Sequence, residues 1–367
     1  MPIKSLSGNF VSKGVLPLLA LTGVAAWLSV QPSVHAQGGA GTVEKIKVHG
    51  SSLEGNLEGD PAERDVFVYL PPSYASQPGR RYPVMYFLHG YGATADAYWK
   101  LMTVPDTANK LMNAGTVHEF ILVLPDAHTV YDGSMYSNSP TTGNWEGYVT
   151  HDLVAYIDSH YRTVADRESR GLVGHSMGGY GTFRLAMKYP EVYSSIYAMS
   201  SCCLMNNPGA GRGAATAPAK QAPAAPSDGR GGQGRGGFAN ALSAQAAAWA
   251  PNPMNPPKFF DLPTADGVVL PEISAKWIAN SPLVMVDQYV PNLKQYRSIR
   301  MDVGDQDPLA GTNKQMDESL TRLGILHAFE MYEGTHGNRV KERFETKVLP
   351  FFSENLKFAG GGQAVPK

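Results

Sequence analysis

The chain of 367 residues carries 31 basic and 32 acidic side chains, and this balance argues against a general nucleic-acid binder, which needs a basic excess. With 43% hydrophobic residues, the chain can form a large core and is too apolar to be wholly disordered. Two cysteines rule out a disulfide scaffold and argue against a cysteine-rich zinc site.

The N-terminal segment 1–36 has the pattern of a secretory signal peptide. Lys4 and Lys13 precede an uncharged apolar run at 15–30, and small residues follow it up to Ala36. A retained membrane anchor is the alternative, but the run falls short of the roughly 20 residues that span a bilayer. We therefore expect cleavage after Ala36, a secreted or periplasmic protein, and no stable membrane insertion.

Short apolar runs alternate with helical patterns along most of the remaining chain. Uninterrupted β-branched and aromatic runs suit strands that are covered on both faces, as in a parallel sheet. The predicted strands lie at 45–53, 64–70, 82–88, 120–124, 171–173, 195–199, 298–303 and 328–332. The predicted helices lie at 145–161, 177–189, 314–323 and 339–357. This alternation predicts a single α/β domain over 37–367, with helices on both faces of the sheet and an antiparallel edge made by the first two strands.

The stretch 206–257 differs from the rest of the chain in composition. Of its 52 residues, 32 are Gly, Pro or Ala. Such a composition buries too little apolar surface to offset the entropy of ordering, so we expect a flexible insertion here. The segment GRGGQGRGG at 229–237 is similar to Arg-Gly repeats that bind RNA, but a solvated loop is favoured in an exported protein, and no nucleic-acid partner is expected.

The segment GHSMG at 174–178 matches the Gly-x-Ser-x-Gly pattern of a nucleophile elbow. In this turn from strand to helix, the serine takes a strained conformation and its hydroxyl projects from the sheet. Glycines two residues before and after the serine prevent clashes with neighbouring backbone. The predicted strand at 171–173 and the helix at 177–189 supply the required context, so we predict that Ser176 is a catalytic nucleophile.

A serine nucleophile needs a base, and the base needs an orienting carboxylate. In this arrangement the base follows the serine along the chain, and only His327 and His336 do so. His327 precedes the last predicted strand, on the side away from Ser176. His336 follows that strand in a loop between Gly334 and Gly337, and we therefore predict His336 as the base.

The orienting acid is expected in the loop GDQDP at 304–308, after the predicted strand at 298–303. Asp305 lies next to the strand end, where it could instead cap the turn through its backbone amides. Asp307 lies further over the sheet edge, where it could reach the imidazole. From the residues alone, both aspartates remain candidates for the orienting acid, and Asp307 is favoured.

A tetrahedral intermediate needs hydrogen-bond donors for its oxyanion. One should be the main-chain N–H of Met177, directly after the nucleophile. The other should come from HGYG at 89–92, where Tyr91 is the candidate. His89 could be read as a base or a metal ligand, but nothing nearby has metal-ligand spacing. A structural role for His89 is favoured, and no metal site is predicted.

Taken together, these motifs resemble the putative-esterase family of α/β-hydrolases, which includes feruloyl and acetylxylan esterases, S-formylglutathione hydrolases and mycobacterial mycolyltransferases. The resemblance covers roughly 43–358, apart from the insertion. It rests on VYLPPSY at 68–74, YPV at 82–84, LHG at 88–90, LPD at 124–126, GHSMGGY at 174–180, and the Gly-x-x-Asp and Gly-x-His loops. It implies an α/β-hydrolase fold with a mostly parallel, eight-stranded sheet, places the acid at Asp307 and supports Tyr91 as an oxyanion donor.

The resemblance implies a serine esterase without metal or organic cofactor, acting on a small-molecule or polysaccharide-linked ester such as a feruloyl or acetyl sugar. An acyltransferase of mycolyltransferase type is one alternative, and a non-catalytic binding protein on an esterase scaffold is another. The insertion departs from the family pattern and leaves the acyl and alcohol parts of the substrate open. The oligomeric state leaves no signal in the sequence.

Five further residues have two interpretations each. Cys202 and Cys203 are expected to be reduced, buried thiols rather than a disulfide, because adjacent cysteines would close a strained eight-membered ring. Tyr136, Trp145 and Tyr148 are equally suited to a substrate cleft and to the core or surface.

Overall fold

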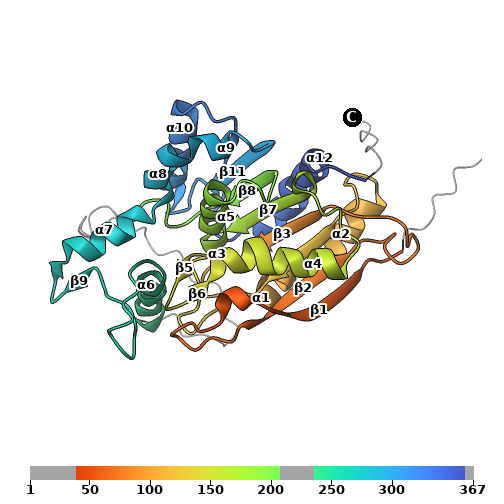
Figure 1. The fold of residues 1–367 in the computed structure, drawn as a ribbon. Coiled ribbons are helices and arrows are strands. Elements are labelled where there is room, and N and C mark those ends of the chain that lie inside the picture. Colours follow the sequence, from red (N-terminus) through yellow and green to blue (C-terminus); the bar gives the residue numbers. More distant parts are fainter. Residues whose placement is uncertain (1–38, 207–234, 360–367) are drawn as a thin grey trace, which may run out of the picture. The chain divides into compact units, whose positions relative to one another are not determined.

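The computed structural model describes residues 39–206 and 235–359 (Figure 1). The predicted signal peptide, its cleavage site and the Arg-Gly segment at 229–234 lie outside the described residues. None of the helices within the described ranges is long and apolar enough to cross a bilayer.

The core of the structure is an eight-stranded sheet in the order β1-β2-β4-β3-β7-β8-β11-β12. Its strands are β1 (Thr42–His49), β2 (Glu63–Leu70), β3 (Val84–Leu88), β4 (Ile121–Pro125), β7 (Arg170–His175), β8 (Ser195–Met199), β11 (Ser298–Gly304) and β12 (Ala328–Tyr332). All pairs from β4 to β12 are parallel, whereas β1 pairs antiparallel with β2 and β2 with β4. The predicted fold class and the antiparallel edge are confirmed. The first strand ends at His49 rather than Leu53, because a 3₁₀ turn occupies Ser51–Leu53.

Helices cover both faces of this sheet (Figure 1). One face packs against α1 (Ala95–Leu101), α2 (Val104–Asn113) and the C-terminal helix, which comprises α11 (Val340–Arg343), a π-helical turn (Phe344–Val348) and α12 (Leu349–Asn355). The other packs against α3 (Trp145–Gly147), a second π-helical turn (Tyr148–Asp152), α4 (Leu153–His160), α5 (Met177–Lys188) and α10 (Ala310–Arg322). The predicted helices at 145–161 and 339–357 are therefore present, each with a π-helical turn inside it.

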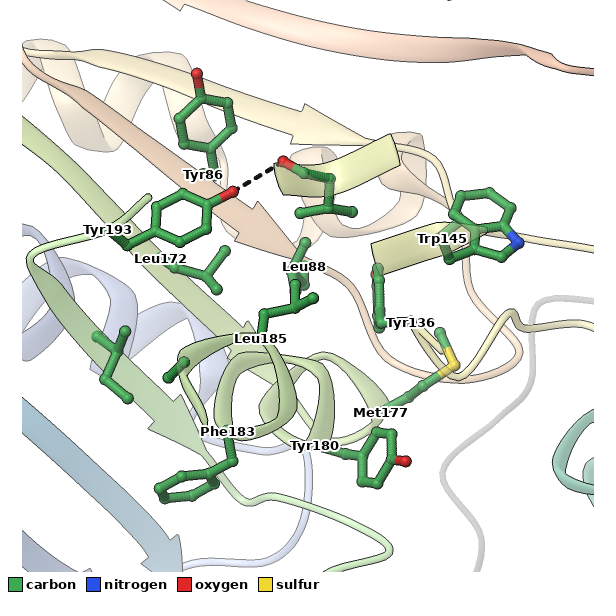
Figure 2. Packing of buried hydrophobic residues seen from close by; sticks show 14 of the residues in the cluster. Tyr86, Leu88, Tyr136, Trp145, Leu172, Met177, Tyr180, Phe183, Leu185 and Tyr193 are labelled. Atoms are coloured by element: carbon green, nitrogen blue, oxygen red, sulfur yellow. Dashed lines mark hydrogen bonds between the residues drawn. The ribbon is translucent and has the colours of Figure 1, made fainter. Parts of the chain in front are cut away.

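Strand β3 shows how the buried runs serve both faces. Successive side chains of a strand point to opposite faces, so Tyr86 and Leu88 contact the α5 side while Met85 and Phe87 contact the α1 side. Figure 2 shows Leu88 beside Leu185 of α5, and Tyr86 beside Tyr193. A strand buried on both faces has no polar positions, which explains the uninterrupted apolar pattern of the sequence.

The three aromatic residues with two interpretations belong to the core. Tyr136, Trp145 and Tyr148 are at most 1% exposed and pack in the cluster on the α5 side. Figure 2 shows Tyr136 and Trp145 in this cluster. The indole N–H of Trp145 donates to the carbonyl oxygen of Thr142, 2.8 Å away, so its one polar atom is satisfied inside the protein. These residues do not form a substrate cleft.

The expectation of a flexible insertion up to Pro257 is wrong for its C-terminal part, which contains α6 (Arg235–Trp249). Trp249 is 2% exposed, and its ring lies 5.5 Å from Tyr180 of α5 and 5.3 Å from Trp277 of α7 (Pro271–Ala279), measured between centroids. Alanine is the strongest helix former and leaves room for close packing, so the alanine-rich composition that predicted disorder here supports a buried helix instead. Residues 207–234 lie outside the described part of the chain.

Short elements complete the region between β8 and β11 and the loop after β4. They are β5 (Asn138–Ser139), β6 (Gly143–Asn144), β9 (Thr264–Ala265), β10 (Val268–Val269), α8 (Pro282–Met285), α9 (Val290–Leu293) and the 3₁₀ turn at Val286–Tyr289. A further 3₁₀ turn, Arg167–Ser169, directly precedes β7. Helix α6 joins this region to β5, because Ser139 Oγ donates to the carbonyl oxygen of Ala247 at 2.5 Å.

Candidate active site

The predicted catalytic residues follow three strands of the parallel part of the sheet. Ser176 comes directly after β7, Asp307 lies in the loop after β11, and His336 lies in the loop after β12. Since β7, β8, β11 and β12 are parallel neighbours, their carboxyl ends meet at one edge of the sheet. Ligand sites of open α/β sheets lie at this edge.

Ser176 takes the strained turn that the elbow motif predicts. Its φ of 57° and ψ of −112° lie outside the regions that are favourable for a non-glycine residue. The turn is tight, because a Cβ on Gly174 would lie 2.2 Å from the carbonyl oxygen of Gly178, and a Cβ on Gly178 would lie 2.0 Å from that of Leu88. Both positions therefore require glycine.

The structure brings Ser176, His336 and Asp307 into one hydrogen-bonded chain. His336 Nε2 lies 2.9 Å from Ser176 Oγ, and His336 Nδ1 lies 2.8 Å from Asp307 Oδ2. A carboxylate accepts the Nδ1–H, which leaves Nε2 free to accept the serine proton. Chemically, this arrangement can activate the serine hydroxyl and return its proton to a leaving group.

Asp307 is held in its ionised form. Burial of its side chain alone would raise its pKa, but hydrogen bonds from His336 and from the main-chain N–H of Leu309 outweigh burial and hold the pKa of Asp307 below its usual range. Asp305 takes a role that differs from the turn cap considered for it, because its Oδ1 accepts the N–H of Gly334 at 3.0 Å and so ties the β11 loop to the β12 loop.

The two segments that carry the predicted oxyanion donors lie next to Ser176. Met177 is the first residue of α5, where a main-chain N–H has no acceptor within the helix. Tyr91 follows Gly90, and a Cβ on Gly90 would lie 3.4 Å from Ser176 Cβ, so the backbone of this loop passes beside the serine. Both side chains lie beside Gly133, where an added Cβ would be 2.7 Å from Met177 Sδ and 2.9 Å from Tyr91 Cδ2.

His89 has the structural role that the sequence favoured. Its Nε2 accepts the N–H of Ala127 at 2.8 Å, and its Nδ1 lies 2.9 Å from the carbonyl oxygen of Gly90. Burial lowers the pKa of His89, so the ring stays neutral and cross-links two loops. In the described part of the chain, no group of three His, Cys, Asp or Glu side chains could hold a metal ion.

His327 does not reach the site. Its Nε2 lies 2.8 Å from Asp317 of α10, and its Nδ1 lies 2.8 Å from the carbonyl oxygen of Ile325. Cys202 and Cys203 are free thiols with their sulfur atoms 2.7 Å apart, and both are half-buried rather than buried as expected. The N–H of Cys202 donates to the carbonyl oxygen of Ser176.

Two features near the site were missed from the sequence. Helix α6 contacts the loop beside the oxyanion region, because Asn240 Nδ2 donates to Asp132 Oδ2 at 3.0 Å and the N–H of Gly92 donates to the carbonyl oxygen of Asp132. His175, inside the elbow motif, contacts the loop that carries His336. Its place next to Ser176 was the only sequence signal available.

Curated relatives match part of this chain. An esterase of Mycobacterium tuberculosis is 34% identical over 131 residues, which are 35% of this chain and 27% of that protein. An S-formylglutathione hydrolase of Paracoccus denitrificans is 30% identical over 147 residues, which are 36% of this chain and 50% of that protein. The match thus spans between about a quarter and a half of the length of these relatives.

Solved structures share the fold over most of the chain. A ferulic acid esterase superposes with a TM-score of 0.62 and 20% identity, covering 86% of this chain and 99% of that one. The fluorophosphonate-binding serine hydrolase FphF of Staphylococcus aureus gives a TM-score of 0.57 and 17% identity, covering 87% and 100%. At these identities the likeness shows the α/β-hydrolase fold. The family model described as "Putative esterase" matches residues 61–350, and the chain belongs to this family.

Proposed function

We propose that the protein is a serine esterase that hydrolyses carboxylic esters through an acyl-enzyme on Ser176. The observation that carries this proposal is the chain of hydrogen bonds from Ser176 Oγ through His336 to Asp307, at 2.9 and 2.8 Å. Membership of an esterase family and the shared fold support it.

In the proposed mechanism, Ser176 Oγ attacks the ester carbonyl carbon while His336 Nε2 takes the hydroxyl proton. The N–H groups of Met177 and Tyr91 stabilise the oxyanion, and His336 passes the proton to the departing alcohol. Water then attacks the acyl-enzyme with His336 again as base, which releases the acid and restores Ser176. Asp307 keeps the imidazole in the tautomer with the proton on Nδ1 and stabilises the imidazolium.

Replacing Ser176 by alanine tests this assignment. We expect Ser176→Ala to abolish hydrolysis of short acyl esters and labelling by a fluorophosphonate probe, with an unchanged circular dichroism spectrum. Ser159→Ala is a matched control, because Ser159 is also hydrogen-bonded to a histidine, with Oγ 3.0 Å from His160 Nδ1, but lies on the surface. Activity of Ser176→Ala near that of the wild type would reject the proposal.

We propose acyl groups linked to carbohydrate as the substrate class, with feruloyl and acetyl esters first. The support is the shared fold with a protein named as a ferulic acid esterase. A panel of feruloyl, acetyl-sugar and plain alkyl esters tests it, and the highest kcat/KM on a plain alkyl ester would reject it.

A second candidate is acyl transfer to a sugar or lipid hydroxyl, which uses the same three residues. The structure of MPT51 from Mycobacterium tuberculosis shares the fold, with a TM-score of 0.55 and 15% identity. Analysis of products with an added alcohol acceptor separates the two reactions, because transfer yields a new ester and hydrolysis yields the free acid. A protein without any fluorophosphonate labelling would instead indicate non-catalytic binding.

We also propose that the protein is exported and that its mature form begins at Gln37. The support is the basic start, apolar run and small residues of segment 1–36. N-terminal sequencing of the protein from the periplasm or culture medium tests this, and an intact Met1 would reject it.

A further inference from the structure

His175 is a buried histidine that the proposed mechanism does not use. It ends β7, directly before Ser176, and is 4% exposed. As the second residue after Val173, its side chain lies on the α1 face of the sheet, opposite to α5. A buried polar ring at this position needs partners for both nitrogens.

Both nitrogens of His175 have partners. Nε2 lies 2.8 Å from the main-chain carbonyl oxygen of His336, and Nδ1 lies 2.6 Å from the hydroxyl of Tyr98 on α1. A carbonyl oxygen only accepts, so Nε2 carries the proton, and the Tyr98 hydroxyl then donates to Nδ1. Burial lowers the pKa of His175 to about 4 and raises that of Tyr98, which keeps both groups neutral at physiological pH.

We propose that His175 and Tyr98 form a positioning pair that holds the His336 loop where its imidazole exchanges a proton with Ser176. This inference rests on the proposed esterase function. Neither residue touches the reacting atoms. The pair acts on the backbone of His336, whose ring is held by Asp307 and faces the serine.

The pair links two parts of the site that are far apart in sequence. The rings of His175 and His336 lie 4.8 Å apart between centroids. Tyr98 also lies against the oxyanion loop at 89–92, since a Cβ on Gly90 would be 2.5 Å from the hydroxyl oxygen of Tyr98. The nucleophile strand, the oxyanion loop and the base loop are therefore fixed to one another through two side chains.

Precise placement matters because proton transfer requires the serine and the imidazole to stay within hydrogen-bond reach, and a misplacement of about 1 Å costs on the order of 100-fold in rate. Loss of the pair should therefore reduce kcat and leave KM nearly unchanged, because the pair acts on the placement of the base and neither residue touches the reacting atoms. A purely structural role would instead change the stability of the protein and leave kcat alone.

Four variants test the inference, with kcat and KM measured on a short acyl ester. We expect His175→Leu to lower kcat by about 100-fold, and His175→Gln, whose amide can still donate toward the His336 carbonyl, to recover most of that loss. Tyr98→Phe keeps the ring and removes the donor to Nδ1, and we expect a fall of about 5-fold in kcat. Tyr86→Phe is the matched control, because its buried hydroxyl has no hydrogen-bond partner among the described residues, and its kcat should not change.

A second readout is the downfield proton resonance of the His336 Nδ1–H bonded to Asp307, which we expect to shift or broaden in His175→Leu and Tyr98→Phe only. Equal kcat values for Tyr98→Phe and Tyr86→Phe would overturn the inference even if His175→Leu does not fold. So would a His175→Gln variant as slow as His175→Leu. A wild-type protein without Ser176-dependent hydrolysis overturns the esterase proposal and this inference together, whereas an active wild type with unaffected variants overturns this inference alone.

Discussion

Replacement of His175 by glutamine should make the stability of the protein less sensitive to acid. The pKa of His175 is lowered by burial from 6.5 to about 4, while in the unfolded chain it returns to its ordinary value. Between these values the unfolded state binds more protons than the folded state, so the free energy of unfolding falls as pH falls. The stability that the neutral, buried form of His175 contributes is fully present above pH 6.5 and is lost as the pH falls toward 4. Glutamine does not titrate and should abolish this effect.

The size of the effect follows from the same two values. At a pH of about 5, protonation stabilises an unfolded histidine by about 2 kcal/mol, while a folded histidine of pKa about 4 is mostly neutral. The wild-type protein should therefore lose about 2 kcal/mol more stability than His175→Gln between about pH 7.5 and about pH 5. Most carboxylates stay ionised over this range in both proteins, which limits their contribution to the difference.

Urea unfolding of both proteins at the two pH values measures this difference. His89, whose pKa is also lowered by burial, is present in both and cancels in the comparison. An equal loss of stability in the two proteins would refute the reasoning, because it would mean that His175 titrates normally and is not enclosed between Tyr98 and the His336 loop.

Three further predictions concern the acid, the elbow and helix α6. Asp307→Asn should lower kcat by about 10⁴-fold, because the amide favours the wrong tautomer of His336. Asp305→Asn keeps an acceptor for the N–H of the β12 loop and should lower kcat much less. Equal losses of kcat in an ester assay would contradict the choice of Asp307 as the acid. Gly178→Ala should abolish ester hydrolysis, since its Cβ would lie 2.0 Å from a carbonyl oxygen. Gly311→Ala is the control and should retain full activity in the same assay, because its Cβ would have no atom within 4 Å. Trp249→Ala should lower the free energy of unfolding by about 3–5 kcal/mol in urea melts, and a loss below about 1 kcal/mol would show that α6 is not anchored by this side chain.

The sheet and the predicted triad were accessible from the sequence because local patterns encode them. Strand β3 is apolar at every position, and the elbow at Ser176 needs glycine at fixed spacing for steric reasons that do not depend on distant residues. The loop positions of Asp307 and His336 follow from strand ends. Such features are decided within a few residues of the chain.

Helix α6 and the Tyr98–His175 pair were not accessible for the opposite reason. The composition of 206–257 averages a glycine-rich part with an alanine-rich part, and only the contacts of Trp249 with Tyr180 and Trp277 show that the second part is buried. Tyr98 lies 77 residues before His175, and its segment contains no motif. Tertiary contacts between distant residues leave no local pattern to read.

The order of the strands has a consequence for the folding of the protein. Ser176 follows a central strand, but its acid follows β11 and its base follows β12. These two strands complete one edge of the sheet and come last along the chain. A folding intermediate with strands β1 to β8 in place would have the elbow and the oxyanion loop without the imidazole. Under the proposed mechanism, the recovery of ester hydrolysis during refolding therefore reports the docking of β11 and β12.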